Sequence, residues 1–124
     1  GQVYHKPVSS FDIFATAAAN SAGVTAPKQV EGVDLIPYLT GKNNGVPHET
    51  LFWRQGGKSA LRHGDWKLVR MRKRLVAGKA NWELYDLSKD LSEENNLAAS
   101  QPERLAELIE IWETHNSEMS EPLF

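Results

Sequence analysis

The stretch SQPERLAELIEIWETH, residues 100–115, opens with the residues of this sequence that could most directly carry out chemistry. Its first five residues fit the pattern Ser-x-Pro-x-Arg, in which a serine can be converted into a catalytic aldehyde. The same residues could begin a helix, because Ser100 can cap it, Pro102 suits the first turn and Glu103 completes a capping box. A modified nucleophile would need a metal site and converging basic groups, and the neighbouring sequence NNLAASQPERLAEL offers neither. We therefore interpret Ser100 as a helix cap.

The four histidines, at positions 5, 48, 63 and 115, are isolated from one another in the sequence. They form no His-x-x-x-His pair and accompany no Asp-x-Asp cluster, so their spacing does not indicate a metal site. His63 and Asp65 flank Gly64, which is typical of a turn. The segment GGK, residues 56–58, lacks the upstream glycine and the Ser or Thr of a phosphate-binding loop. The sequence thus predicts no catalytic residue, no metal ligand and no cofactor within this chain.

A basic cluster falls where the third expected strand turns back toward the fourth, and we term residues 70–79 the basic tip. Five cations lie within these ten residues: Arg70, Arg72, Lys73, Arg74 and Lys79. One interpretation is a solvated hairpin tip, because charged residues also protect sheet edges from pairing. The other is a patch for anionic ligands, sulfated glycans included. No aromatic residues alternate with the cations, so single-stranded nucleic acid is not favoured.

The whole chain has 124 residues, no cysteine and a net charge of −2 at neutral pH. The absence of cysteine excludes disulfides, thiol nucleophiles and thiolate metal sites. The nearly balanced charge gives no overall attraction to nucleic acid or to a membrane surface. No apolar run approaches the ~20 residues that a membrane-spanning helix needs. The opening residues GQVYHKPVSS have no apolar core, so an export signal would have to lie outside this chain.

The first 49 residues predict one helix followed by an ordered loop. Ser9 and Asp12 form a capping-box-like start for a helix over residues 11–20, with Gly23 placed to end it. Phe11, Phe14 and two alanines line one apolar face of that helix. Residues 24–49 carry three prolines and three glycines, so we expect a loop with one short helical turn.

The remaining residues predict an α+β arrangement: a roughly four-stranded antiparallel sheet packed by a C-terminal helix. Short segments rich in aromatic and branched residues alternate with glycine turns at 55–58 and 63–66. A helical stripe then appears at Leu105, Leu108, Ile109 and Trp112, and we expect it to lie across one face of the sheet. The tryptophans available to the sheet and the closing helix are Trp53, Trp66, Trp82 and Trp112.

Five segments, in this order, resemble the C-terminal third of a type I sulfatase, of the arylsulfatase family in the alkaline phosphatase superfamily. They are KPVSSFDIFATAAANSAG, EGVDLIPYLTGK, LFWR with ALRHGDWKLVR, WELYDL, and ENNLAASQPERLAEL. The resemblance runs over nearly all of the chain, and its motifs are specific in combination. Ala15 and Leu91 depart from it, because the family usually has proline at these positions, which affects only local turns.

The resemblance implies a two-part fold. Residues 1–46 would be the tail of the large α/β catalytic domain, and residues 47–124 the small C-terminal subdomain. Family members hydrolyse sulfate esters with a formylglycine and a calcium ion, and the residues for both precede the segment matched here. SQPER aligns with the closing helix of the family. Loops of this subdomain can border the substrate pocket, which makes four residues candidate substrate contacts: His48, Arg54, Arg62 and His63.

The sequence therefore favours the C-terminal fragment of a sulfuric ester hydrolase that is inactive by itself. Its expected partners are the missing N-terminal sulfatase domain and, in the full enzyme, a sulfate ester. Without that domain the apolar face of the first helix favours a homodimer. Two alternatives stay open: the same region of a phosphonate or phosphate monoester hydrolase, or a stand-alone anion- or glycan-binding module using the basic tip. Family habit favours the periplasm or secretion.

Overall fold

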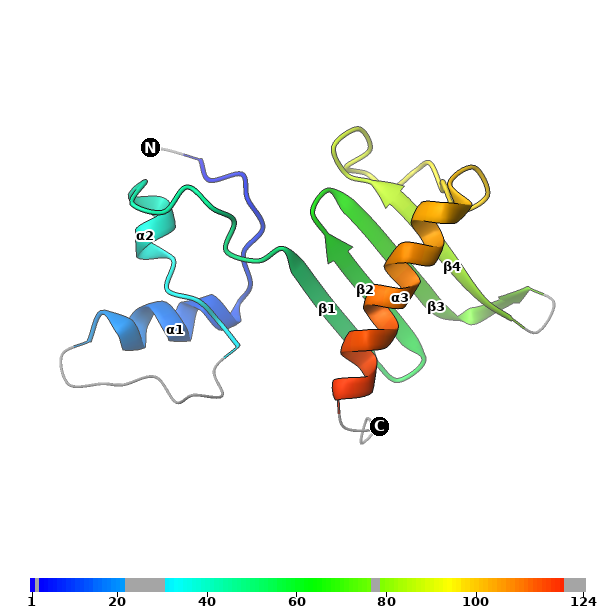
Figure 1. Cartoon of the computed structure of the whole chain (residues 1–124), viewed down its shortest axis with the longest axis horizontal. Helices are drawn as coiled ribbons and strands as arrows, with labels where there is room; N and C mark the ends of the chain where they lie inside the picture. The colour runs from blue at the N-terminus through cyan, green and yellow to red at the C-terminus, as the bar shows by residue number, and fades with distance from the viewer. Residues whose placement is uncertain (2, 22–30, 77–78, 120–124) are drawn as a thin grey trace. The chain divides into compact units, whose positions relative to one another are not determined.

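The computed structural model describes residues 1, 3–21, 31–76 and 79–119, and within residues 72–81 it describes no side chains. The described chain forms two compact units, Gly1–Glu49 and Thr50–Phe124, which we term the first and second units (Figure 1). None of the helices in the described residues is long and apolar enough to cross a membrane.

The first unit contains the predicted helix, α1, which spans Phe11–Ala19. Asp12, Ala15 and Ala18 are buried, whereas Phe11 and Phe14 are more than half exposed. Asp12 accepts the backbone N–H of Ser9 at 2.7 Å, which is one half of the predicted capping box. The other half is absent, because Ser9 Oγ accepts the N–H of Phe11 instead, at 3.4 Å. The start of α1 is therefore stabilised by the carboxylate of Asp12, a residue of its first turn, which accepts the N–H of Ser9 before the helix.

The predicted helical turn in the following loop is α2, Ile36–Leu39. Asp34 begins it by accepting the N–H of Ile36 at 3.0 Å, and Pro37 lies in its first turn, where a missing N–H costs nothing. Gly23, which we expected to end α1, lies outside the described residues. The helix itself ends at Ala19, where Asn20 donates its backbone and side-chain N–H groups to the carbonyl of Thr16.

The second unit contains the predicted antiparallel meander, with strand order β1-β2-β3-β4 (Figure 1). The strands are β1 Thr50–Gln55, β2 Lys58–His63, β3 Trp66–Val76 and β4 Lys79–Asp86. Both predicted tight turns are present. Gly56 and Gly64 adopt φ values of 55° and 59°, which glycine tolerates and most other residues do not. The register between β3 and β4 shifts between Arg70 and Leu75, so the outer half of this hairpin is irregular.

The closing helix, α3, spans Pro102–Glu118 and covers one face of the sheet (Figure 1). Leu61, Leu68 and Leu84 are opposite one another on three neighbouring strands, and each is fully buried. Leu108 and Trp112 of α3 close this core, with Leu105 and Ile109 packed at its edge. The predicted stripe on the closing helix is thereby confirmed. Burial of each leucine contributes about 2 kcal/mol relative to exposure, so this core holds the unit together.

Ser100 does not cap α3, which corrects our interpretation of SQPER. The residue before the helix is Gln101, at φ −128° and ψ 58°, and no side chain caps the helix start. Ser100 Oγ instead donates to the carbonyl of Leu97 at 3.2 Å, within a turn that precedes the helix. Proline disfavours a helical conformation in the residue before it, so the helix begins at Pro102 and the spacing required for a Ser100–Glu103 box is lost.

Trp53 does not join the core beneath α3, and this is a second correction. Side chains alternate along a strand, and in β1 it is Phe52 that stands opposite the buried Leu61. The Phe52 ring stacks on Trp112 with centroids 5.8 Å apart. Trp53 consequently points to the opposite side of the sheet, where it is 50% exposed. We term this side, which α3 does not cover, the open face.

Candidate functional site

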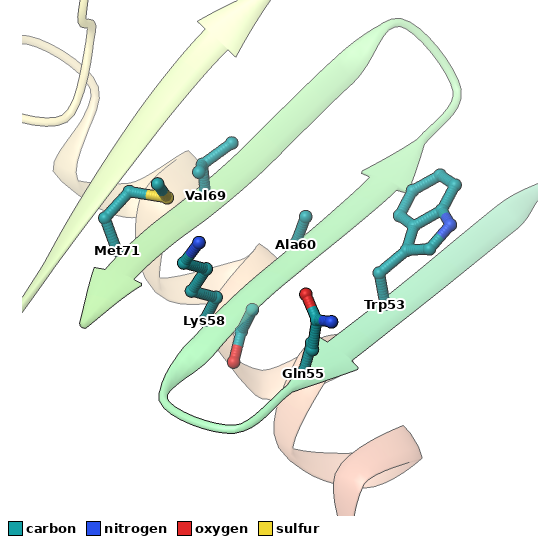
Figure 2. A pocket seen from close by; sticks show the side chains of 7 residues that line it. Trp53, Gln55, Lys58, Ala60, Val69 and Met71 are labelled. Atoms are coloured by element: carbon teal, nitrogen blue, oxygen red, sulfur yellow. The ribbon is translucent and has the colours of Figure 1, made fainter. Parts of the chain in front are cut away.

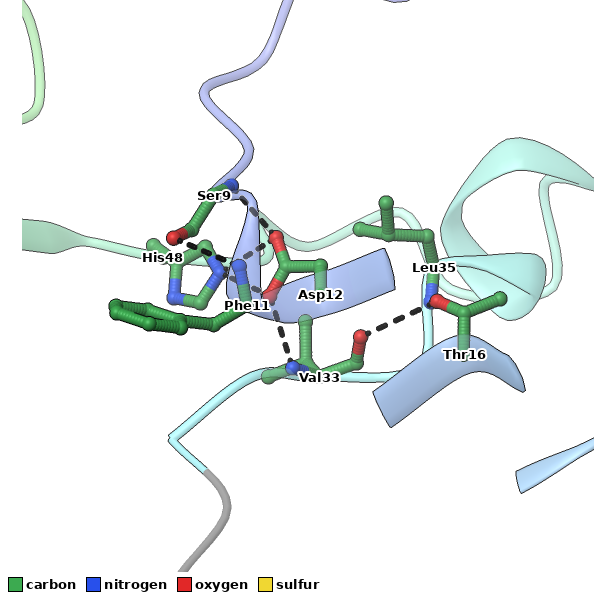
Figure 3. A network of polar contacts seen from close by, with 7 residues as sticks. All are labelled: Ser9, Phe11, Asp12, Thr16, Val33, Leu35 and His48. Carbon is green, nitrogen blue, oxygen red and sulfur yellow. Dashed lines mark hydrogen bonds and ion pairs between the residues drawn. The ribbon is translucent and has the colours of Figure 1, made fainter. Parts of the chain in front are cut away.

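The first candidate site residue, His48, is held by a buried carboxylate within the first unit (Figure 3). Its Nε2 lies 2.8 Å and 2.9 Å from the two carboxylate oxygens of Asp12. Asp12 is completely buried and also accepts the backbone N–H groups of Ser9 and Val33. Burial alone would raise the pKa of Asp12, but the hydrogen bonds from Ser9, Val33 and His48 outweigh it and lower the pKa. The carboxylate therefore stays ionised and fixes the histidine ring.

A second set of contacts ties the segment at 32–35 to α1, and so shapes the surroundings of Asp12. Thr16 Oγ1 accepts the N–H of Leu35 at 2.9 Å (Figure 3). Gly32 is required by the close approach, because a Cβ at this position would lie 2.2 Å from the carbonyl oxygen of Phe11. The segment can therefore place the N–H of Val33 on Asp12 only with glycine beside it.

Fixing His48 through Nε2 leaves Nδ1 as the second functional nitrogen of the ring. In the neutral tautomer that donates Nε2–H to Asp12, Nδ1 is an acceptor, and in the cation it becomes a donor. No described residue hydrogen-bonds to Nδ1. An aspartate that holds a histidine in this way fixes the direction in which its second ring nitrogen points. The pairing with Asp12 was not predicted, because 36 residues separate the two partners.

The other three candidates lie on the β1–β2 hairpin of the second unit, and they do not form one cluster. Arg54 Nη1 donates to Asn116 Oδ1 of α3 at 2.6 Å. His63 Nδ1 lies 2.8 Å from Thr50 Oγ1, its cross-strand partner. Arg54 and His63 face the α3 side from opposite ends of the hairpin. Arg62, the neighbour of His63, points to the open face by strand alternation and donates from Nε to the carbonyl of Gly64.

The first residue of the basic tip, Arg70, does not have the solvated position that the sequence suggested. Arg70 is not a solvated cation, because its guanidinium carbon lies 4.7 Å from the ring centre of Trp82 and 4.8 Å from that of Trp112. Its Nη2 also donates to Ser59 Oγ at 3.0 Å. Arg70 is thus part of the packing beneath α3. The side chains of the other four members lie outside the described residues.

The open face carries a feature that the sequence analysis did not anticipate, namely a shallow hollow of about 180 Å³ (Figure 2). The signal was present in the sequence, since apolar residues occupy both alternating sets of strand positions. The residues that line the hollow come from β1, β2 and β3: Trp53, Gln55, Lys58, Ser59, Ala60, Val69 and Met71.

The part of the chain that the structure describes contains no set of side chains able to bind a metal ion. No group of three His, Asp or Glu side chains converges there. Asp86 and Asp90 line one pocket, but each is already occupied by other groups. Asp86 is occupied by the side chains of Lys89 and Ser88, and Asp90 by the backbone N–H groups of Asn95 and Glu94. The described residues therefore do not fit a calcium ion.

No family model matches the chain, but comparison with known proteins gives relatives that are named as sulfatases. Over 66 residues it is 42% identical to an uncharacterised sulfatase of Schizosaccharomyces pombe, a match that covers 53% of this chain and 12% of that protein. It is 38% identical over 52 residues to the uncharacterised sulfatase YdeN of Escherichia coli, covering 40% of this chain and 9% of YdeN. The aligned stretches thus span about a tenth of the length of these relatives.

Solved structures give the same result for the fold. Ps i-CgsB matches 96% of this chain with a TM-score of 0.72 and 22% identity, over 26% of its own length. BT1596, described as a 2-O GAG sulfatase, matches 78% of this chain with a TM-score of 0.58 and 24% identity, over 22% of its length. At these identities the likeness shows the fold alone. The chain is thus similar in sequence to parts of two proteins named as sulfatases, and similar in fold to the C-terminal part of solved sulfatases.

Proposed function

We propose that this chain is the C-terminal part of an enzyme that hydrolyses sulfate esters, and that the catalytic residues lie in a part of the protein outside it. The observation that carries the proposal is the 42% identity, over 66 residues, to a protein named as a sulfatase. The fold match over 96% of the chain supports it. Neither alternative, the phosphate or phosphonate monoester hydrolase or the stand-alone binding module, finds support among these relatives.

The formylglycine and the calcium ion expected for the full enzyme belong, in this proposal, to the part outside the chain. When present, they would supply the nucleophile and the charge that stabilises the sulfate group. Within the chain, residues 1–46 would be the tail of the catalytic domain and residues 47–124 the C-terminal subdomain. The contact that Asp12 makes with His48 lies within the first unit and orders the residues just before β1.

The role proposed for this chain's own residues is to contact the substrate. His48 and His63 each have one ring nitrogen fixed, by Asp12 and Thr50 respectively, so the other nitrogen is available for a sulfate oxygen. Arg54 and Arg62 would add guanidinium groups, which bind anionic oxygens strongly. The four residues lie on different faces and units, so we propose them as separate contacts rather than as one pocket.

The substrate class proposed is a sulfated glycan. Ps i-CgsB has been solved in complex with k-i-k-neocarrahexaose, and BT1596 is described as a 2-O GAG sulfatase. Both names concern sugar chains, and a sugar ester would offer several hydroxyls and anionic oxygens for the histidine and arginine contacts.

The test is an assay of ester hydrolysis by the chain and by a longer protein that contains it. We expect the longer protein to release sulfate from an aryl sulfate, and to act on the aryl phosphate far more slowly. We expect the 124-residue chain alone to release nothing, with or without calcium. Turnover by the chain alone, or a longer protein that hydrolyses only the phosphate, would refute the proposal.

A further inference from the structure

The open face of the sheet is apolar where a solvated face would ordinarily be polar. Trp53, Ala60 and Val69 are direct neighbours on β1, β2 and β3, and Met71 lies two residues beyond Val69 on the same side. Trp53 is 50% exposed and Met71 47%. An antiparallel sheet with one face in water usually alternates polar residues onto that face. Single exposed apolar residues are normal, but a contiguous group of this kind marks an interaction surface.

The shape of this surface suits a protruding apolar side chain. The small side chain of Ala60 forms the floor of the hollow, between Trp53 on one strand and Val69 on the next (Figure 2). Gln55 and Lys58, a cross-strand pair, stand at one end, and Met71 lies beyond Val69. A hollow of about 180 Å³ is large enough for one aliphatic or aromatic side chain.

The charges around the hollow limit what can cover it. Lys58, Arg62 and Lys67 all belong to the open face by strand alternation, and Lys67 is paired with Glu93 from the same unit. A second copy that presented the same face about a two-fold axis would bring Lys58 and Arg62 toward like charges. A partner with carboxylates beside an apolar projection would complement the surface.

We propose that the open face is the surface onto which the rest of a longer sulfatase docks. An apolar side chain of that part would enter the hollow over Ala60, and carboxylates would meet Lys58 and Arg62. This rests on the proposed function, because it requires that the chain belong to a longer sulfatase. The length of the related proteins favours this occupant. The chain covers only 26% and 22% of the two solved proteins it resembles, so most of such a protein is available to cover the open face.

The first test measures the solvent exposure of Trp53 by hydroxyl-radical labelling and mass spectrometry. In the 124-residue chain, Trp53 should be labelled much faster than the buried Trp112. In the longer protein, labelling of Trp53 should fall several-fold to the level of Trp112. Equal labelling of Trp53 in the two proteins would overturn the proposal.

The second test fills the hollow with Ala60→Leu and uses Ala106→Leu, on the exposed side of α3, as the matched control. Both variants of the 124-residue chain should melt like the parent, which shows that each still folds. In the longer protein, Ala60→Leu should lower the melting temperature and restore labelling of Trp53, whereas Ala106→Leu should do neither. Identical behaviour of the two variants in the longer protein would contradict docking at this face.

Other occupants give different results. Protection of Trp53 that appears in the chain alone as its sedimenting mass doubles would assign the face to a second copy. Protection that appears only on adding a sulfated oligosaccharide would assign it to substrate. Either result overturns the proposal. Hydrolysis of the aryl sulfate is a separate readout. A longer protein that protects Trp53 but releases no sulfate would refute the proposed function, and the open face would then be a docking surface within a longer protein of another activity.

Discussion

The carboxylate of Asp12 and Nε2 of His48 lie 2.8 Å apart, although 36 residues separate them in the sequence. Asp12 is fully buried in the first turn of α1, and the side chain of His48 is 12% exposed. One carboxylate thus joins three segments: the start of α1, the loop segment at Val33 and the residues that lead into β1. The first unit has few other buried side chains among its described residues, so this contact determines much of its order.

Replacing Asp12 with alanine should destabilise the first unit by about 3 kcal/mol, because three donors lose their acceptor in a buried position. Amide hydrogen exchange of α1 measures this directly, and its protection should fall while that of β2 and β3 stays unchanged. Glu31→Ala, which removes an exposed carboxylate from the same unit, should leave the exchange rates near those of the parent. Unchanged protection of α1 in the Asp12 variant would show that the contact is not structural.

The same carboxylate predicts how the first unit responds to acid. The pKa of Asp12 in the folded chain is lower than its usual value of 3.8, so folding favours the ionised form. Its contribution is fully present above the usual pKa and is lost as the pH falls through the lowered folded value. Protection of α1 should therefore decrease between about pH 5 and pH 2, and this decrease should be shallower in Asp12→Asn. Equal pH dependence in the parent and the variant would contradict this assignment.

Arg70 should be structural rather than a ligand for anions. Its guanidinium lies over the rings of both Trp82 and Trp112, which meet edge to face, and a planar cation gains from both rings. Arg70→Ala should lower the free energy of unfolding by about 2 kcal/mol, and Arg70→Lys by about 1 kcal/mol, in urea denaturation. Arg104→Ala is the control, because Arg104 lies nearer the surface over Trp66 and should cost no more than about 0.5 kcal/mol.

The turn before α3 should depend on Asn96 and not on Ser100. Asn96 Oδ1 accepts the N–H groups of Leu84 and Ala98, so it links β4 to this turn. Asn96→Ala should cost about 1 kcal/mol in urea denaturation, whereas Ser100→Ala should change stability by less than about 0.5 kcal/mol. A larger loss for Ser100→Ala than for Asn96→Ala would restore the capping-box interpretation that the structure contradicts.

Local patterns predicted the elements of this chain well, because helices and hairpins are encoded by neighbours. The stripe from Leu105 to Trp112 and the glycines at 56 and 64 each act within a few residues. Long-range partners were not predictable in this way. The contact of Asp12 with His48 and the position of Arg70 over two tryptophans depend on how distant segments pack.

The corrections at Trp53 and at the start of α3 arise where two local sequence rules make different predictions. In β1, Phe52 and Trp53 are both aromatic, so alternation predicts that one faces the core but does not say which. At α3, the preference of proline for an extended preceding residue outweighed the capping-box spacing. The four proposed substrate contacts stay predictions, because the partners of His48, Arg54, Arg62 and His63 within this chain do not reveal a substrate.

The exposed face of α1 predicts self-association of the isolated chain. Phe11, Ile13 and Phe14 are 61%, 70% and 56% exposed within the first unit. Burying such side chains contributes roughly 1.5–3 kcal/mol each when it is complete, which is enough to drive weak dimerisation. Identical helices can pair about a two-fold axis, so a dimer is the expected form.

Analytical ultracentrifugation of the 124-residue chain measures this association, and its mean mass should rise toward twice the monomer mass with concentration. Phe14→Glu should keep the chain monomeric, because a dimer would bury its charge at the centre of the contact. Ile36→Glu, an equally drastic change at an exposed position on α2, should leave the dimer intact. Trp53→Glu should also leave it intact, because the cations around the open face disfavour pairing of that face with itself. A monomer at all concentrations, or a dimer lost on changing Trp53 and kept on changing Phe14, would place the contact elsewhere.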